Sequence, residues 1–448
     1  MSGNKGTMGE LLERARGAVA SARKHGAAGA RASLTRERES QVEWRDGKLD
    51  RLRESTRMSL RLALFVDGRF GVCNTSDLRP QAVARFIAEA VASTRALARD
   101  PFRGLPDPAR YVRRRAESEL RLLDPEVARV SPDERRRLAR ELEAAARSAP
   151  GAGGIVSVSS SCGDAVMEGA LVTSNGMEGS TSRSVFWLEA DVTVRDHGNR
   201  KPTGWWYAST RHRKSLPDVE EVGRKATERA LRQVGAAPIA TGEYACVVEN
   251  TVAGRLARAL TDALEGQAIQ QRRSFLAGKV GQSIGSATLH LEEDPHLPEG
   301  LGSRGFDDEG MSTHPRTIVD RGVLRSCYLD TYYAKKLNQQ ATSGARFNLV
   351  YAPGTRDLGA LLRAMDRGIL VTGFNGGNSN TTTGDFSFGI HGQLVEGGRP
   401  VRPVAEMNLA GTHLRLWKAL EETGNDPFPY SSNRSPSLRF APVQFSGV

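Results

Sequence analysis

Residues 251–281 read TVAGRLARALTDALEGQAIQQRRSFLAGKVG and form the most informative stretch of the chain. Apolar residues recur in it at helical spacing, which predicts an amphipathic helix over 251–273. The helix runs into a Ser-Phe-Leu-x-Gly-Lys-x-Gly segment. Short strand patterns with glycine turns surround it in sequence, so we expect one long helix packed on a sheet-rich core.

The composition is typical of a soluble globular protein. The chain has 448 residues, of which 39% are hydrophobic and 26% charged, and this length allows two or three domains. The 47 glycines predict many turns and therefore much β structure. No apolar run approaches the roughly 18 residues that a membrane span needs. The first residues also lack the apolar core of a signal peptide, so we expect neither a signal peptide nor membrane contact.

The cysteines give no sign of a metal or redox motif. Cys73, Cys162, Cys246 and Cys327 are widely spaced, with no Cys-x-x-Cys pair. Disulfides are rare in the cytosol. We therefore predict that all four are small buried hydrophobic residues.

A net charge of +11 raises the question of nucleic-acid binding. Two arginine clusters are candidates for phosphate contacts, namely Arg110, Arg113, Arg114, Arg115 and Arg135, Arg136, Arg137. Aromatic residues make up only 6% of the chain and do not interleave with these clusters. No helix-turn-helix or zinc-finger pattern occurs. We interpret the clusters as solvated helix faces and expect no specific nucleic-acid binding.

Residues 1–235 are predicted to form an N-terminal domain of the α/β type with an antiparallel meander. A first helix presents apolar residues on one side, and five strand-like runs follow over 28–74. Asp46-Gly47 and Asp67-Gly68 mark hairpin turns between these runs. The further predicted helices are 80–99, a helix opening at the capping box 131–134 and ending near 149, and 217–234. The further predicted strands are 154–161, 165–174, 179–195 and 203–210, with a turn at Asn175-Gly176.

Gly235-Ala236-Ala237-Pro238 is the predicted boundary to a second domain, 236–448. This domain carries the helix 251–273 and many short strands between glycine turns, which favours a β-rich, barrel-like core. Its strand patterns are TLHLE, TIVDRGVLRSCYL, GILVTGF and FGIHGQLVEGG, and a closing helix is predicted over 412–424. The expected fold class is therefore α+β.

Several segments, in order along most of the chain, resemble the TldD/PmbA family. The central one is ALEGQAIQQRRSFLAGKVGQ, part of the stretch quoted first. The others are LRLALFVDGRFGVCNTSDL, GFDDEGMSTHPRTIVDRGVLRSCYLDTYYAKKL and TTTGDFSFGIHGQLVEGGRPVRPVAEMNLAG. Their shared order and spacing carry the resemblance.

Active members of that family carry an HExxxH motif on the central helix, a pattern in which two His bind Zn²⁺ and the Glu acts as general base. Matched on Leu264-Glu265-Gly266, the three positions are Ala257, Arg258 and Asp262 here. The metal-binding branch also uses a downstream Cys, and this chain has none after Cys327. The chain therefore resembles the PmbA (TldE) branch, in which HExxxH is missing.

The resemblance implies a non-catalytic subunit with no cofactor of its own. Zinc is expected only in a TldD-like metallopeptidase partner, and the complex would trim or degrade small unfolded peptides in the cytoplasm. Known cases mature a peptide antibiotic or affect an antitoxin of DNA gyrase. Two alternatives stay open, namely an active metallopeptidase with an unorthodox metal site and a basic regulator associated with nucleic acid.

Other residues could carry chemistry or shape a groove. The segment HLEEDPH places His290 and His296 on either side of three carboxylates. We interpret it either as a weak metal-binding site or as a surface turn. Ser387 and His391 invite a nucleophile hypothesis, but no G-x-S-x-G elbow surrounds the serine, and we interpret their proximity as chance. Two motifs are candidates for a groove or a structural turn, namely Asp307, Asp308, Glu309, Gly310 and Gly384, Asp385, Phe386, Ser387.

Trp205, Trp206 and Tyr207 are adjacent in a predicted strand. Successive side chains of a strand face opposite ways. One of these rings is therefore expected in the core with its neighbour outside, either at an interface or peptide groove or buried on the other face of the sheet.

Overall fold

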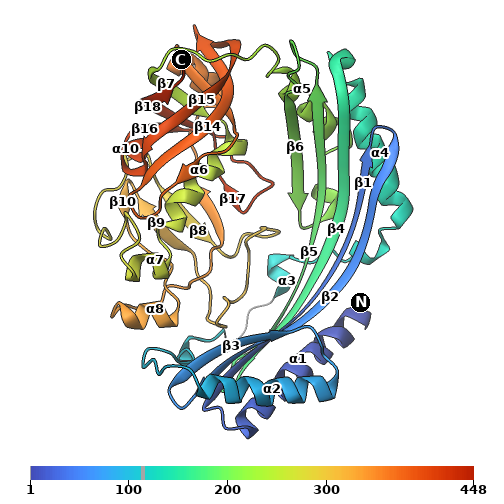
Figure 1. Ribbon diagram of the computed structural model, residues 1–448, viewed down its shortest axis with the longest axis vertical. Coiled ribbons are helices and arrows are strands. Elements are labelled where there is room, and N and C mark those ends of the chain that lie inside the picture. The colour runs from blue at the N-terminus through green and yellow to red at the C-terminus, as the bar shows by residue number, and fades with distance from the viewer. Residues whose placement is uncertain (1, 113–116) are drawn as a thin grey trace.

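The first half of the chain builds one long antiparallel sheet (Figure 1). The structure is a computed structural model that describes residues 2–112 and 117–448. The sheet has six strands in the order β3-β2-β1-β4-β5-β6. Their bounds are β1 Gly29–Arg45, β2 Lys48–Val66, β3 Arg69–Thr75, β4 Ile155–Thr173, β5 Glu178–Val194 and β6 Thr203–Thr210.

The predicted hairpin turns are confirmed, but the strands between them are longer than predicted. Asp46-Gly47 and Asp67-Gly68 all have positive φ, the conformation that tight two-residue hairpin turns require. The five runs predicted over 28–74 are three strands, because no turn interrupts β1 or β2. The runs 154–161 and 165–174 are likewise the single strand β4, whose register with β1 is continuous.

Four helices cover one face of this sheet and leave the other face free for the second half (Figure 1). Even-numbered residues of β1, including Ala32, Leu34 and Val42, are buried against the helices. These helices are α1 Ser2–Lys24, α2 Pro80–Arg95, α4 Pro132–Ser148 and α5 Val219–Leu231. The connections include α3 Glu117–Leu120, η1 Pro108–Arg110, η2 Val127–Arg129, η3 Ala152–Gly154 and η4 Arg213–Ser215.

The arginine clusters are not simple solvated faces. α4 begins as predicted, but Arg135 on it is buried and pairs with Asp164 at 2.6 Å, so that part of the prediction is wrong. Residues 136–137 are exposed and pair with acidic residues of the same helix. Arg110 donates to a backbone carbonyl of the second half, and residues 113–115 lie outside the described residues. Arg135 is therefore committed to the fold.

The second half contains a closed barrel of five strands. Each strand pairs with the next in the circle β7-β12-β14-β15-β18 and back to β7, with β7 and β12 parallel and the other pairs antiparallel. The strands are β7 Gly242–Val248, β12 Gly368–Phe374, β14 Asp385–Glu396, β15 Arg399–Thr412 and β18 Leu438–Ser446, with β13 Asn378–Ser379 and β16 Leu420–Thr423 attached. The α+β class and the barrel-like core are thus confirmed.

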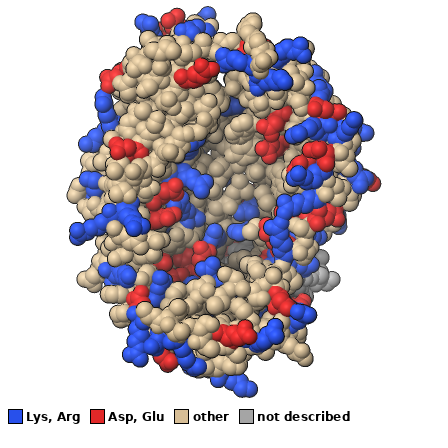
Figure 2. Space-filling model, in the orientation of Figure 1, with Lys and Arg blue, Asp and Glu red and all other residues tan. Residues whose placement is uncertain are grey.

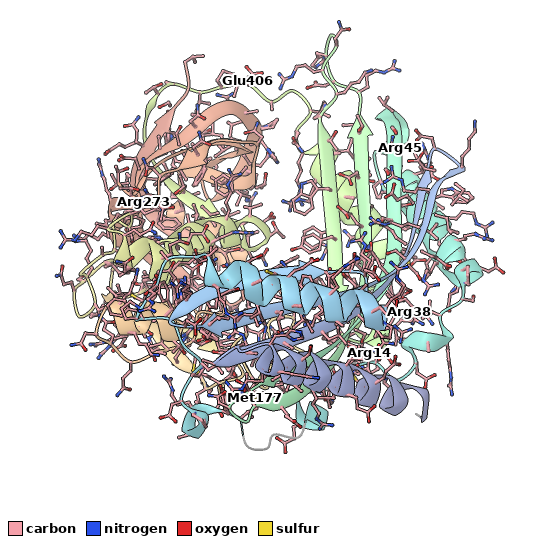
Figure 3. All side chains as sticks on the ribbon, turned by 60° about the horizontal axis from the view of Figure 1, so that its bottom comes forward. Arg14, Arg38, Arg45, Met177, Arg273 and Glu406 are labelled. Atoms are coloured by element: carbon pink, nitrogen blue, oxygen red, sulfur yellow. The ribbon has the colours of Figure 1, made fainter. Side chains whose placement is uncertain are left out.

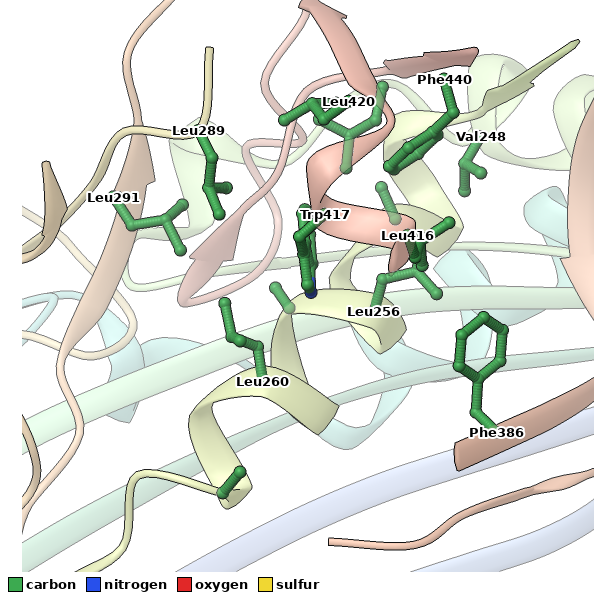
Figure 4. Packing of buried hydrophobic residues seen from close by; sticks show 14 of the residues in the cluster. Val248, Leu256, Leu260, Leu289, Leu291, Phe386, Leu416, Trp417, Leu420 and Phe440 are labelled. Carbon is green, nitrogen blue, oxygen red and sulfur yellow. The ribbon is translucent and has the colours of Figure 1, made fainter. Parts of the chain in front are cut away.

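A smaller sheet and several short helices complete this half. The sheet order is β10-β9-β8-β11-β17. Its strands are β8 Leu291–Asp294, β9 Arg316–Asp320, β10 Val323–Leu324, β11 Asn348–Tyr351 and β17 Asn433–Arg434, and the helices are α6 Asn250–Asp262, α7 Gly266–Gln270, α8 Thr331–Lys336, α9 Leu358–Met365 and α10 His413–Lys418. Leu256 and Leu260 of α6 pack near Trp417 of α10 in one core (Figure 4).

The helix predicted over 251–273 is shorter than expected. α6 ends at Asp262, and residue 265 then forms a parallel β-bridge with Tyr328. The backbone nitrogen of Tyr328 donates to the carbonyl of Leu264, and that of Gly266 donates to the carbonyl of Tyr328. A Cβ on Gly266 would lie 2.9 Å from the Tyr328 carbonyl oxygen, so this contact needs a glycine. The helical spacing of apolar residues did not predict this break, because the residue that causes it, Tyr328, is about 60 positions away in the sequence.

The predicted closing helix is also too long. α10 ends at Lys418, and residues 420–423 form β16 instead. These residues form backbone hydrogen bonds with β18, and this pairing replaces the expected continuation of the helix.

All four cysteines are free thiols, as predicted. Three are buried, whereas Cys73 is half-buried, so the prediction that all four are buried is wrong for Cys73. In the described part of the chain, no helix combines the length and apolarity that crossing a bilayer demands.

Gly204 allows α5 to touch β6, and its replacement should destabilise the fold. A Cβ at this position would lie 2.1 Å from the backbone nitrogen of Ala230. We expect Gly204→Ala to lower the free energy of unfolding by about 1–3 kcal/mol, because helix and sheet must separate. Urea unfolding of Gly204→Ala beside Gly153→Ala measures this, since a Cβ on Gly153 meets nothing within 4 Å. Equal stability of the two variants would contradict the close packing.

Candidate functional site

A cleft lies between the inner face of the first sheet and the second half of the chain. It encloses about 520 Å³ between β6, α6, the small sheet and the barrel strands β12 and β14. Figure 2 shows the molecule hollowed near its centre, with basic and acidic side chains along the rim. The side chains that the following argument uses are those of Trp205, Tyr207, Arg255, Arg258, Glu293, Tyr328, Arg346, Phe374 and His391.

Aromatic rings of β6 form one wall. Trp205 and Tyr207 stack with ring centroids 5.7 Å apart, and Trp205 is 38% exposed. Trp206 points to the other face, where Lys225 of α5 lies 4.5 Å from its ring centroid. Strand alternation thus places Trp205 and Tyr207 toward the cleft, and both remain open to a ligand.

A buried carboxylate organises the opposite side. The Glu293 side chain is 1% exposed and receives two hydrogen bonds from Arg316, at 2.7 and 3.0 Å. Tyr328 Oη donates to it at 2.9 Å and the backbone nitrogen of Phe347 at 3.2 Å. Burial and the Glu293 charge raise the pKa of Tyr328 well above its usual value. Tyr328 therefore stays protonated at neutral pH.

Arg346 extends this arrangement to the end of α6. It donates to Asp262 at 2.6 Å and also pairs with Glu265. Its guanidinium carbon lies 5.5 Å from the centroid of the Tyr328 ring. A charged group over an aromatic face is stabilised by the ring quadrupole. Arg346 thus holds Asp262 in an ion pair.

Arg255 connects α6 to the loop before β13. It donates to the carbonyl oxygens of Gly376 and Gly377, at 2.8 and 3.2 Å, and lies 4.6 Å from the Phe388 ring centroid. Burial lowers the pKa of Arg255. Arg258, one turn later, is exposed to the cleft and has no side-chain partner in the described part of the chain. Arg258 is therefore the cation that a ligand can reach.

His391 lies on β14 with its ring directly over Gly373. A Cβ on Gly373 would come within 1.9 Å of this ring, so only glycine fits beneath it. Burial, followed by the charge of Arg229, lowers the pKa of His391 to about 4. At neutral pH the imidazole is uncharged and can accept or donate one hydrogen bond.

The three positions matched to HExxxH do not converge. Ala257 is fully buried in the core, Arg258 faces the cleft, and Asp262 is half-exposed in its pair with Arg346. Five residues along a helix turn through about 140° relative to the starting face. Positions 257 and 262 therefore lie on different faces of the helix.

The residues present do not fit a zinc ion. In residues 2–112 and 117–448, no group of three or more His, Cys, Asp or Glu side chains could hold a metal. His290 contacts Glu292 and Asp320, at 3.2 and 3.5 Å. His296 instead contacts the hydroxyl of Thr313 at 2.9 Å. The two histidines thus have separate partners.

The two remaining motifs lie outside this cleft. Asp307 accepts hydrogen bonds from the backbone nitrogens of Glu309 and Met311, both at 2.9 Å, so its carboxylate caps a turn as the sequence suggests. The side chain of Asp308 pairs with Arg304, and Gly310 has the positive φ that completes the turn.

In the second motif, Phe386 is buried beside His413, and Gly384 lies against the ring of Phe275. Asp385 accepts from Thr383 at 2.6 Å. Ser387 is exposed on β14, and the rise over four strand positions places it about 13 Å from His391, too far for a nucleophile–base pair.

The cleft thus offers donors and aromatic surface, whereas Glu293 and Tyr328 are already hydrogen-bonded to each other. Arg255, Arg258 and Arg346 are its arginines, and Glu293, its one lining carboxylate, is neutralised by Arg316. Such a surface binds carbonyl oxygens, carboxylates and flat or apolar side chains. Sequence reasoning missed Arg255, Arg346 and Tyr328. Their partners are distant in sequence, and only the strand alternation around His391 hinted at an inward-facing histidine.

The sequence matches three domain models described as PmbA/TldA metallopeptidase. Domain 1 matches residues 30–94, the central domain 125–234 and the C-terminal domain 241–447. The metalloprotease PmbA of Escherichia coli O157:H7 is 29% identical over 426 residues, which cover 94% of this chain and 92% of that protein.

Solved structures are similar over nearly the whole chain. A candidate modulator of DNA gyrase from Bacteroides thetaiotaomicron is 40% identical and covers 97% of this chain and 98% of its own, with a TM-score of 0.93. TldE from Thermococcus kodakarensis has the same fold, at 20% identity over 97% of this chain and 100% of its own, with a TM-score of 0.86.

His391 should make stability depend on pH. The folded pKa is about 4 and the usual value 6.5, so the unfolded chain binds a proton that the folded chain does not. Its contribution is therefore complete above pH 6.5 and is lost as the pH falls toward 4. When the pH is lowered from 7 to 5, the free energy of unfolding of the wild type should fall. We expect it to fall by up to about 2 kcal/mol more than that of His391→Gln.

Urea unfolding at several pH values measures this difference. His314→Gln is the control, since His314 is exposed. Parallel pH profiles of His391→Gln and wild type would contradict the burial of an uncharged His391.

Proposed function

This chain belongs to the PmbA/TldD metallopeptidase family, and from that we propose that it is a non-catalytic subunit of a peptidase complex. It binds small unfolded peptides in the central cleft, and a TldD-like partner with an intact HExxxH cleaves them. Zinc belongs to that partner, and the complex works in the cytoplasm.

The observation that carries this proposal is the state of the three HExxxH positions. A zinc peptidase needs two neutral imidazoles and a carboxylate base beside one another. Here the first position is a methyl group in the core, the second is a cation, and the third is a carboxylate bound to Arg346. A guanidinium in place of the general base would also repel a metal dication.

The cleft suits the binding of extended peptides. Arg258 is free to donate to a backbone carbonyl or a terminal carboxylate, while Trp205 and Tyr207 present ring faces to side chains. Contacts to the peptide backbone do not depend on sequence, which suits a subunit that handles unfolded peptides of many kinds.

The two alternatives have weaker support. An unorthodox metal site would need His290 and His296 to share an ion, but their side chains contact different residues. A nucleic-acid role would need a continuous basic face, but Arg135 is buried in an ion pair with Asp164.

Restoring the motif should not restore zinc binding. In the variant Ala257→His, Arg258→Glu, Asp262→His, the first imidazole enters the core, where overpacking costs about 1–3 kcal/mol. We expect a lower melting temperature and no stoichiometric zinc by elemental analysis. The double variant Arg258→Glu, Asp262→His leaves the core intact and is the control. About one zinc per chain in the triple variant would contradict the placement of position 257.

The decisive assay compares peptide cleavage by this chain alone, by a TldD-like partner alone and by the two together. We expect cleavage only when the partner is present, and faster cleavage with both, alongside a complex detected by light scattering. Arg258→Ala in the complex should raise KM about tenfold, the equivalent of one charged hydrogen bond of about 1.4 kcal/mol. Arg140→Ala, on exposed α4, should leave KM unchanged. Chelator-sensitive cleavage by this chain alone would overturn the proposal.

A further inference from the structure

A second cavity lies on the inner face of the first sheet, outside the cleft described above. It encloses about 450 Å³ between strands β1, β2, β4 and β5 and the segment 303–308. Its walls carry the side chains of Arg31, Arg61, Arg183 and Arg304, with hydroxyl groups of Ser33 and Thr181 beside them. The proposed peptidase role uses none of these residues.

Two of these arginines have carboxylate partners and two have none. Arg31 lies 3.5 Å from Glu309, and Arg304 pairs with Asp308 at 2.7 Å. Within the described residues, neither Arg61 nor Arg183 makes a hydrogen bond or an ion pair with its side chain. The cavity therefore holds more positive than negative charge.

The nearby carboxylates cannot supply the missing charge. Asp307 is 3% exposed and bound to backbone nitrogens of its own turn. Burial raises its pKa, which disfavours the charged form. Glu309 uses its second oxygen for the backbone nitrogen and hydroxyl of Thr331, both at 2.8 Å.

A fifth guanidinium, that of Arg211, lies close enough to Arg183 and Arg304 to add to the repulsion. It is 4% exposed and donates to the carbonyl oxygens of Ser184 at 3.0 Å and Leu301 at 2.5 Å, so it is part of the fold. Burial, then Arg183 and Arg304, lowers its pKa to about 9, which leaves it a cation at neutral pH. Burial and Arg304 also lower the pKa of Arg183, and the charges of Asp308 and Glu37 offset this lowering only in part.

A partly buried arginine beside other arginines, as Arg183 is, is costly unless an anion joins it, whereas Arg61 is exposed. The guanidinium group matches the two oxygens of a carboxylate or phosphate with parallel hydrogen bonds. A concave site with low-dielectric walls also concentrates anions. Ser33 and Thr181 provide further donors.

We propose that this cavity is an oxyanion-binding site in which Arg183 and Arg61 hold a carboxylate or phosphate group of a small ligand. The charge excess favours an oxyanion over a neutral ligand, and the cavity is large enough for more than the anion itself. The site stands independently of the peptidase role, because its residues and the cleft residues are different.

Isothermal titration calorimetry of the purified full-length chain at low salt tests the site with three probes. The first is inorganic phosphate. The second is an N-acetylated tripeptide with a free carboxyl terminus, and the third is the C-terminal amide of that tripeptide. We expect phosphate, the free-acid tripeptide or both to bind, and the amide to bind at least tenfold more weakly than the acid. Binding of phosphate alone identifies a phosphate ligand, and binding of the acid alone a peptide carboxylate. No binding of phosphate or acid would overturn the proposal.

Arg183→Gln locates the binding. It should weaken affinity at least tenfold, whereas Arg45→Gln, with the same loss of charge at the far end of β1 (Figure 3), should change it less than twofold. Because Arg183 has no partner, Arg183→Gln should melt no lower than the wild type without ligand. Unchanged affinity in Arg183→Gln, or a marked fall in its melting temperature, would contradict the proposal. Arg61→Gln repeats the test at the second arginine.

Discussion

A buried ion pair between Arg229 and Glu249 joins the two halves of the protein, and the shape of the cleft depends on it. The two side chains are 11% and 9% exposed and lie 2.5 Å apart. Arg229 belongs to α5, on the outer face of the first sheet, and Glu249 immediately precedes α6. Arg229 also donates to the carbonyl of Thr372 at 2.6 Å, so the same guanidinium reaches β12. Removing one member of such a pair leaves a buried charge and typically costs about 3–5 kcal/mol.

The arginines of this protein divide according to whether the fold satisfies them. Arg135, Arg229 and Arg316 are buried with carboxylates and hold strands, helices and loops in place. Arg258 and Arg183 face cavities without a partner in the described residues. A high net charge alone does not distinguish the two groups, because the same residue type serves both. The distinction rests on burial and partners, and it separates arginines that build the structure from those available to a ligand.

The PmbA/TldD fold is present in this chain without an HExxxH motif on α6. Leu256, Ala257 and Leu260 pack α6 into the core, so burial holds the helix in place. Asp262, at a position that the resemblance matches to a metal ligand, pairs with Arg346. Burial and ion pairs therefore hold this helix without a metal, which is consistent with the proposed role in binding.

Much of the architecture was determined by local sequence. The Asp46-Gly47 and Asp67-Gly68 turns, the alternation of β1 and the Ser131 cap each depend on neighbouring residues, and each was predictable. The absence of HExxxH could likewise be read directly from positions 257, 258 and 262. The tertiary structure decided where α6 ends, because the backbone around Leu264 forms hydrogen bonds with Tyr328. It also decided which arginines have partners, because these partners come from distant segments. Arg346 pairs with Asp262, whereas Arg183 forms no ion pair within the described residues.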